Sequence, residues 1–336
     1  MNAVLKVIQD RFKNCSIPGA REDKHKVALV VEGGGMRAVV SAGMLTAIAR
    51  LGFLNCIDAV YGSSAGAINA AYFIANQPEY GLSVYYKNVN NSKFISYIRF
   101  VAKKPILSLA YLVNNIFEKE KKMDCEKILN SKIDLNILAS SLDSKSLKVF
   151  SKFKEKEEIY TALKASSCIP WFAGSPIVID NERFIDASFY NSIPFDIAVK
   201  DHCTHILVLR SWGRGFYKQA APFYEKLIFS THLRYLDKDM VDYYFKKRHL
   251  AYNESIKFLE TVAPSITRPP YIYSIELERD ECSINQLEKN SSKLILGAVS
   301  GYKAVLREFG FFNAQLVEVL MPYTIQGHPI NFGDNF

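Results

Sequence analysis

The sequence predicts a three-layer α/β sandwich with a largely parallel central sheet, followed by a helical C-terminal extension. Apolar runs of strand length alternate with longer stretches of helical spacing, a pattern typical of successive βα units. Two of these runs end in glycine-rich turns that lead directly into a predicted helix. The 336 residues, 49% of them hydrophobic, are enough to bury a sizeable core.

Three segments are expected along the chain. They are an N-terminal arm (residues 1–26), a core that holds most strands (27–212), and a mostly helical segment packed on that core (213–336). Strands are predicted where short apolar runs are bounded by turn residues. These runs are Val27–Val31, Ile57–Tyr61, Leu147–Phe150, Pro176–Ile179, Arg183–Ile185, Ile206–Leu209 and Tyr271–Ile275.

Helices are predicted where apolar residues recur every three or four positions. Residues 79–143 are expected to be mostly helical, and their aromatic side chains to fill the core or to form a cap over the site. The other predicted helices are Ala3–Phe12, Met36–Leu51, a stretch from Ser64 to about Asn76, Tyr160–Ser166, Phe216–Val262 and two closing helices.

The turn Gly62-Ser63-Ser64-Ala65-Gly66 has the pattern G-x-S-x-G and joins a predicted strand to a predicted helix. Small residues must flank the serine in such a turn, because its backbone is strained and the helix passes close to the strand. Ser64 is therefore the candidate nucleophile. The N–H of Ala65 and the helix dipole would lie beside any developing negative charge. Because small residues also mark ordinary tight turns, a purely structural role is the alternative.

A second turn, Gly33-Gly34-Gly35, follows the first predicted strand. Free backbone N–H groups there could point at one place and form an oxyanion hole. Gly33, Gly35 and Ala38, with Asp58 about 20 positions further on, also imitate a dinucleotide-binding fingerprint. In that fold the acid closes the second strand, whereas Asp58 lies near the start of the second apolar run. The oxyanion interpretation is therefore favoured.

In the order of its motifs, the chain resembles the bacterial branch of the patatin-like phospholipases. The likeness begins at the two glycine turns and runs beyond residue 250. Its blocks are Glu32-Gly33-Gly34-Gly35-Met36-Arg37, Gly62 to Gly66, Ala165-Ser166-Ser167-Cys168-Ile169-Pro170, Asp186-Ala187-Ser188 with Asn191 and Pro194, Arg248-His249 with Tyr252-Asn253, and Gly301-Tyr302. The family's usual Asp-Gly-Gly or Asp-Gly-Ala is here Asp-Ala-Ser, which adds a methyl and a hydroxymethyl group beside Asp186.

The resemblance implies a serine hydrolase that cleaves acyl esters of lipids through a Ser-Asp dyad. Ser64 would be its nucleophile, Asp186 its base, and Gly33 to Gly35 its oxyanion hole. Arg37 would orient the glycine loop or meet a phosphate. The expected substrate is a phospholipid or another acyl ester, and no cofactor is expected.

The residues alone leave a Ser-His-Asp triad open, because histidine is the usual base for a serine nucleophile. The chain order of the nucleophile, then Asp186, then His202 or His205, fits such a triad. An aspartate base needs apolar surroundings, since these raise its pKa toward neutrality. Flanking residues that could supply them are Phe184, Ile185 and Phe189.

Two other functions fit the same residues. An acyltransferase would use Ser64 in the same way and pass the acyl group to an alcohol. A catalytically inactive lipid-binding protein would keep the fold without turnover.

The formal charge of +8 and a pI near 9.0 favour contact with anionic surfaces such as phospholipid headgroups. A basic, aromatic-rich stretch after residue 216 could lie on a membrane surface. No compact basic stripe interleaved with aromatics is evident, so no nucleic-acid partner is expected. The aromatic residues of that stretch include Phe223, Tyr224, Phe229 and Tyr235.

Six scattered cysteines without a C-x-x-C pattern predict a reduced, cytoplasmic protein. The first 26 residues lack the apolar core of a signal peptide, and no apolar run approaches the roughly 20 residues of a membrane span. We therefore expect any lipid to be met peripherally, at a membrane surface. His202 and His205 flank Cys203, but no second cluster at zinc spacing supports them, so no metal is expected.

Overall fold

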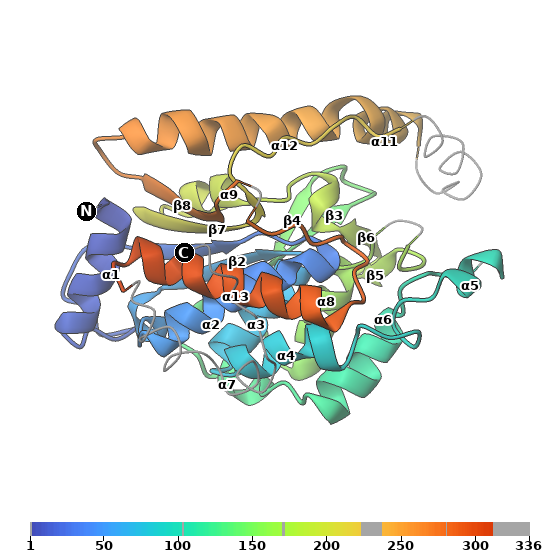
Figure 1. Cartoon of the computed structure of the whole chain (residues 1–336), viewed down its shortest axis with the longest axis horizontal. Coiled ribbons are helices and arrows are strands. Elements are labelled where there is room, and N and C mark those ends of the chain that lie inside the picture. The colour runs from blue at the N-terminus through green and yellow to red at the C-terminus, as the bar shows by residue number, and fades with distance from the viewer. Residues whose placement is uncertain (1, 103, 170–171, 223–236, 280, 312–336) are drawn as a thin grey trace.

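The structure is a computed structural model that describes residues 2–102, 104–169, 172–222, 237–279 and 281–311. Within these residues, eight strands form one mixed sheet in the order β5-β6-β3-β2-β1-β7-β8, with β4 paired to β3 (Figure 1). The neighbouring strands β3, β2, β1, β7 and β8 pair in parallel. Strands β4 and β6 pair antiparallel with β3, and β5 pairs antiparallel with β6. The strands are β1 (Val27–Val31), β2 (Ala59–Ser63), β3 (Asp134–Ser141), β4 (Leu147–Phe150), β5 (Ile177–Ile179), β6 (Glu182–Asp186), β7 (His205–Gly213) and β8 (Tyr271–Leu277).

Helices cover both faces of the sheet, which confirms the predicted three-layer α/β class (Figure 1). Successive side chains of β1 alternate between the faces. Leu29 and Val31 pack with the larger layer, and Ala28 and Val30 with the smaller. The larger layer holds α2 (Val39–Arg50), α3 (Ala65–Ile74), α4 (Pro78–Lys87), α7 (Cys125–Leu129), α8 (Lys156–Ser166) and α13 (Ser291–Glu308); the smaller holds α9 (Phe195–Lys200), α11 (Lys238–Asp242) and α12 (Arg248–Lys257).

The N-terminal helix α1 (Ala3–Lys13) belongs to the larger core, because Val4, Leu5 and Ile8 are buried in it. Short helical segments complete the connections. They are η1 (Gly35–Ala38), η2 (Leu54–Cys56), α5 (Tyr97–Val101), α6 (Leu109–Tyr111), η3 (Leu112–Glu120), η4 (Ala187–Phe189), η5 (Tyr243–Lys247), η6 (Phe258–Val262) and η7 (Ala263–Ser265).

Helix α13 lies directly on α2, and glycine makes this approach possible. A Cβ atom at Gly301 would lie 2.9 Å from the carbonyl carbon of Val40. The helix begins at Ser291, and the side chain of the preceding Asn290 caps it by accepting a hydrogen bond from the Lys293 amide at 3.0 Å. The C-terminal segment thus adds both this helix and the edge strand β8 to the core.

Two predictions of local structure were wrong. Strand β3 lies within residues 79–143, which were predicted to be mostly helical; it is buried from Leu135 onward, so no alternation of polar and apolar residues marks it. Residues 216–222 are irregular, so the predicted helix Phe216–Val262 does not begin at Phe216; its described helical residues include α11, from Lys238 to Asp242. The second closing helix and the aromatic residues Phe223, Tyr224, Phe229 and Tyr235 lie outside the described residues. None of the described helices is both long and apolar enough to cross a membrane.

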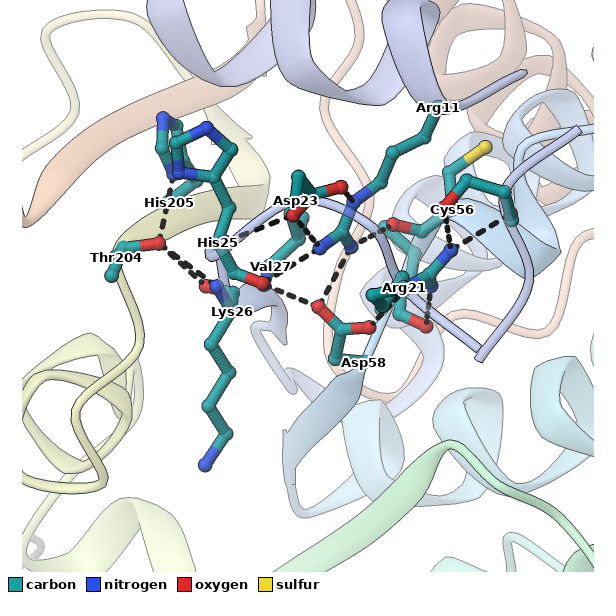
Figure 2. A network of polar contacts seen from close by, with 12 residues as sticks. Arg11, Arg21, Asp23, His25, Lys26, Val27, Cys56, Asp58, Thr204 and His205 are labelled. Carbon is teal, nitrogen blue, oxygen red and sulfur yellow. Dashed lines mark hydrogen bonds and ion pairs between the residues drawn. The ribbon is translucent and has the colours of Figure 1, made fainter. Parts of the chain in front are cut away.

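At the amino edge of the parallel strands, a network of ion pairs holds the N-terminal arm (Figure 2). Arg11 is only 2% exposed and donates hydrogen bonds of 2.7 to 2.9 Å to Asp23 and Asp58. Arg21 bonds the other carboxylate oxygen of Asp58 at 2.8 Å. Asp58 also accepts a hydrogen bond of 2.8 Å from the Val27 amide. One carboxylate therefore ties the arm to the start of β1 and β2.

We predict that Arg11→Met lowers the free energy of unfolding by about 3 kcal/mol, because Asp58 and Asp23 lose a buried partner. The hydrogen bond from Arg11 lowers the pKa of Asp23 to about 2. This stabilisation is complete above the ordinary aspartate pKa of about 4 and is lost as the pH falls toward 2. Urea unfolding at several pH values should therefore show the variant and the wild type converging below pH 4.

The control is Lys13→Met, which removes the same charge from an exposed position of the same helix. It should change stability by less than about 0.5 kcal/mol. Equal losses in the two variants would show that the network does not hold the arm.

Candidate active site

The candidate site lies where β2 and β6 meet end to end along one edge of β3. On β3, Leu138 pairs with Ser63 of β2, and the next residue, Ala139, pairs with Asp186 of β6. Strand β4 occupies the opposite edge of β3 at both positions. The end of the parallel strand β2 and the end of the antiparallel strand β6 therefore face each other. This register brings Ser64, which follows β2, to Asp186.

The two side chains make a direct hydrogen bond. The Ser64 hydroxyl donates to Oδ2 of Asp186 at 2.6 Å, with no group between them. Ser64 is 5% exposed and Asp186 is 1% exposed, so the contact is shielded from bulk water. A carboxylate at this distance is within the range required of a general base.

The backbone of Ser64 is strained, as expected for a nucleophile turn. Its φ of 56° lies in the left-handed region, and its ψ is −131°. Gly66 makes the turn possible, because a Cβ there would lie 2.9 Å from the carbonyl carbon of Glu32. At the end of α8, Ser166 accepts a hydrogen bond from the Ser64 amide at 2.9 Å. The strained residue is thus fixed by the close packing at Gly66 and by the hydrogen bond to Ser166.

The loop Gly33–Gly35 runs beside the Ser64 turn. A Cβ at Gly33 would lie 2.9 Å from Cβ of Ser64, so any larger residue would push the two loops apart. Gly34 and Gly35 have φ values of 148° and 59°, which other residues rarely adopt. Among the described residues, none accepts a hydrogen bond from the three amides. They remain available to an oxygen atom bound at Ser64.

Arg37 lies under the glycine loop and is 3% exposed. Its guanidinium stacks on Trp212 at 3.8 Å and donates to the Ser211 hydroxyl at 3.2 Å. Ser211 in turn donates to the Gly33 carbonyl at 3.0 Å. Buried Glu32 accepts hydrogen bonds from the Ser211 amide at 2.7 Å and from the Tyr252 hydroxyl at 2.9 Å. These contacts support the role of Arg37 in orienting the loop.

Asp186 has contacts at each of its polar groups. Its amide donates to the Cys168 carbonyl at 2.9 Å, and its Oδ1 accepts from the Ser188 amide at 2.8 Å. Burial raises the pKa of Asp186 above its ordinary value, while hydrogen bonds from Ser188 and Ser64 and the charge of Arg248 lower it by smaller amounts. The net direction is upward, which makes the carboxylate a stronger base than an exposed aspartate.

An almost entirely apolar cavity opens beside Ser64. It lies between the glycine loop, α3, α4 and the segment from Phe94 to Leu112. This lining can take up a hydrocarbon chain but offers little to a polar one. The apolar residues that line it include Met36, Ile68, Val84, Phe94, Leu109 and Leu112.

The histidines that would complete a triad lie at the amino ends of the parallel strands, at the end of the sheet opposite to Ser64. His205 begins β7 and pairs with Val27, the first residue of β1 (Figure 2). Burial, together with the nearby His25 and Arg11, lowers the pKa of His205 to about 4. His202 lies in the turn just before β7. The geometry therefore does not support a triad, and these histidines form no metal cluster with other described residues.

Asp58 lies at the same amino edge, so the dinucleotide fingerprint does not form a site. It is bonded to Arg11, Arg21 and the start of β1, whereas the glycine loop follows the end of β1. The acid and the glycines are separated by the length of a strand.

Three contributors to the site have no strong local signal in the sequence. In the sequence Ser166 is only part of a motif, although its hydroxyl accepts from the Ser64 amide. Ser188 stands out only as a departure from the family pattern, and the block that contains Arg248 predicts no role for it. The backbone of Ser188 bonds Asp186, and Arg248 bonds Ser188 from 60 residues away. Only the folded chain shows these pairings.

Comparisons with known proteins relate the chain to one family. The family model of the patatin-like phospholipases matches residues 29–199, half of the chain. An Escherichia coli K12 protein, uncharacterized protein YjjU, is 29% identical over 188 residues, which cover 55% of this chain and 52% of that protein. The match thus spans about half the length of that relative. The crystal structure of VipD from Legionella pneumophila aligns over 86% of this chain and 67% of its own, with 12% identity and a TM-score of 0.44. On the match to the family model, the chain belongs to the patatin-like phospholipase family.

Proposed function

We propose that the protein is a serine acyl hydrolase of lipid esters that acts through a Ser64–Asp186 dyad. One observation carries the proposal: the Ser64 hydroxyl bonds directly to a buried Asp186 at 2.6 Å, at the mouth of an apolar cavity. The family supplies the class of reaction, since its name denotes phospholipid hydrolysis. The apolar lining supports an acyl chain as the part of the substrate bound beside the nucleophile.

In the first half of the reaction, Ser64 attacks the ester carbonyl as Asp186 takes the hydroxyl proton. The carbonyl oxygen becomes an oxyanion, and the amides of Gly33 to Gly35 and of Ala65 donate hydrogen bonds to it. Such a donor typically contributes about 3 to 4 kcal/mol to transition-state stabilisation. Asp186 then gives its proton to the departing alcohol, and an acyl group remains on Ser64.

In the second half, Asp186 takes a proton from water as the water attacks the acyl-enzyme. Collapse of the second oxyanion releases the fatty acid, and the proton returns to Ser64. The base must be ionised at the start of each half. Because burial raises the pKa of Asp186, activity falls as the pH drops through this raised value rather than through the ordinary value of about 4.

The Asp-Ala-Ser sequence does not block this contact. Ala187 is fully buried and packs in the core with Leu138 and Ile193. Its methyl group therefore occupies core space rather than the line between Ser64 and Asp186. An inactive lipid-binding protein is the less supported alternative for this reason. An acyltransferase would require the same dyad, and product analysis with an added acceptor alcohol separates the two.

We expect Ser64→Ala to lose covalent labelling by a fluorophosphonate probe and to lose ester hydrolysis by at least 10³-fold, on the order seen when a catalytic serine is removed. The wild type should be labelled at a single site, identified by mass spectrometry, and should release fatty acid from phospholipid vesicles. Circular dichroism should show that the variant keeps its fold. Labelling of another residue, or hydrolysis that survives in the variant, would refute the assignment.

The second prediction compares the dyad with the triad. Asp186→Asn should reduce kcat by several orders of magnitude, because an amide cannot accept the serine proton. His202→Ala and His205→Gln should retain activity within about threefold, since both residues lie at the far edge of the sheet. A large loss of kcat in either histidine variant, with the fold intact, would favour the triad instead.

The third prediction concerns the strained turn. Ser166→Ala should lower the free energy of unfolding by about 1 to 2 kcal/mol, because the buried Ser64 amide loses its acceptor. Ser167→Ala is the matched control: its buried hydroxyl has no partner among the described residues, so its removal should be neutral or slightly stabilising. Denaturant unfolding of both variants tests this difference. Equal effects would mean that the Ser166 bond does not hold the turn.

A further inference from the structure

Asp186 is reached by a second polar chain, on the side away from Ser64. The guanidinium of Arg248, on helix α12, donates through Nε to the Ser188 carbonyl at 2.9 Å and through Nη2 to the Ser188 hydroxyl at 3.1 Å. The Ser188 amide donates to Oδ1 of Asp186 at 2.8 Å, and a hydrogen bond from the Ser188 side chain also lowers the pKa of Asp186. The order Arg248, Ser188, Asp186, Ser64 is thus a continuous line of hydrogen bonds.

We propose that Arg248 and Ser188 are positioning residues for Asp186: Arg248 fixes Ser188, and Ser188 holds one carboxylate oxygen so that the other faces Ser64. This inference rests on the proposed catalytic dyad. It gives a role to the Ser188 hydroxyl, which a glycine or alanine at this position would lack.

The geometry favours positioning over a purely structural contact. A forked guanidinium that binds both the carbonyl and the hydroxyl of Ser188 leaves little freedom to that hydroxyl. Since its oxygen accepts from Arg248, its hydrogen remains free to point at Asp186. The carboxylate then has a donor for Oδ1 from Ser188 and a donor for Oδ2 from Ser64. Oδ1 is therefore bound by Ser188, and Oδ2 accepts the hydrogen bond from Ser64.

Arg248 is itself held in place by aromatic packing. Its guanidinium lies 4.8 Å from the ring of Tyr244. Its side-chain hydrogen bonds among the described residues both go to Ser188. Helix α12 thus brings the positive charge of Arg248 close to Asp186 without a direct ion pair between the two side chains. The charge favours the ionised carboxylate, which is the form that acts as base.

Other charged or titratable groups also face this carboxylate. Lys218, in the segment after β7, lies close enough to Asp186 for their charges to interact, and its Nζ donates to Ser192 at 3.2 Å. Burial raises the pKa of the Cys168 thiol, after α8, and the nearby charge of Asp186 raises it further. Neither is bonded to the carboxylate side chain among the described residues. Burial and the charge of Arg248 both lower the pKa of Lys218, so Arg248→Met also favours the charged form of Lys218, whereas Ser188→Ala leaves this pair of cations in place.

The test is the rate of fluorophosphonate labelling of Ser64 as a function of pH, in the full-length protein. Loss of a donor or of a nearby cation raises the pKa of Asp186, so the acid limb of the profile moves to higher pH. In Ser188→Ala the limb should move up by about one pH unit, the size expected when a carboxylate loses one hydrogen bond. At alkaline pH the rate should return to within about threefold of the wild type.

Arg248→Met should move the limb in the same direction, and Arg248→Lys should move it less, because lysine keeps the charge but not the fork. Lys247→Met is the matched control, since it removes the same charge at the preceding, exposed position. Its profile should coincide with that of the wild type. Where Arg248→Met fails to fold, Ser188→Ala decides, because it removes only a hydroxyl group.

Two results would overturn the positioning role. One is an acid limb that stays in place in both Ser188→Ala and Arg248→Met. The other is a rate lowered equally at every pH, which is what a structural defect would give. A wild-type protein that is folded but never labelled would instead refute the proposed dyad, so the two failures can be told apart.

Discussion

The register of β3 is the constraint on which the candidate site depends. Two adjacent residues of this strand, Leu138 and Ala139, pair with Ser63 and Asp186. A parallel strand and an antiparallel strand are therefore aligned head to head by backbone hydrogen bonds rather than by side-chain packing. Backbone pairing sets positions firmly because a shift of one residue would expose a whole buried face. The Ser64–Asp186 distance of 2.6 Å is a consequence of that pairing.

Close packing of the backbone around Ser64 supplies the rest of the site. Gly33 and Gly66 each lie so near a neighbouring loop that no side chain fits. On the side of the glycine loop, this crowding leaves backbone amides rather than side chains beside Ser64. Amides carry no titratable proton and lose little freedom on binding, so they suit a site that must stabilise a transient charge. The cavity beside them is almost entirely apolar, and electrostatic contacts are stronger in such surroundings than in water.

Local backbone constraints explain why much of the site could be predicted. The turn around Ser64 and the loop Gly33–Gly35 need glycine for reasons that act within a few residues, so their motifs are legible in the sequence. Asp186 could be singled out because it ends a strand within a recognisable block. The alternating strands and helices were sufficient for the fold class, which the mixed eight-stranded sheet confirms.

What could not be predicted depends on pairings between distant residues. The sequence predicts a mostly helical segment where β3 lies, because a strand buried on both faces lacks alternation of polar and apolar residues. His205 and Asp58 fitted catalytic and nucleotide patterns by spacing, but chain order does not reveal which edge of the sheet a residue occupies. The bonds of Arg248 to Ser188 join residues 60 positions apart, and no periodicity records them.

The ion-pair network of Arg11, Arg21 and Asp58 bears on how much of the chain is needed to fold. The family match covers residues 29–199. Arg11, which binds Asp58, lies outside that range, and so do the edge strand β8 and the helix α13 that packs on α2. A fragment cut at the limits of the alignment would leave Asp58 without its arginines, would expose the apolar surface of α2, and would leave β1 without its neighbour β7. The segment that matches the family model is therefore shorter than the segment that packs together as one folded unit.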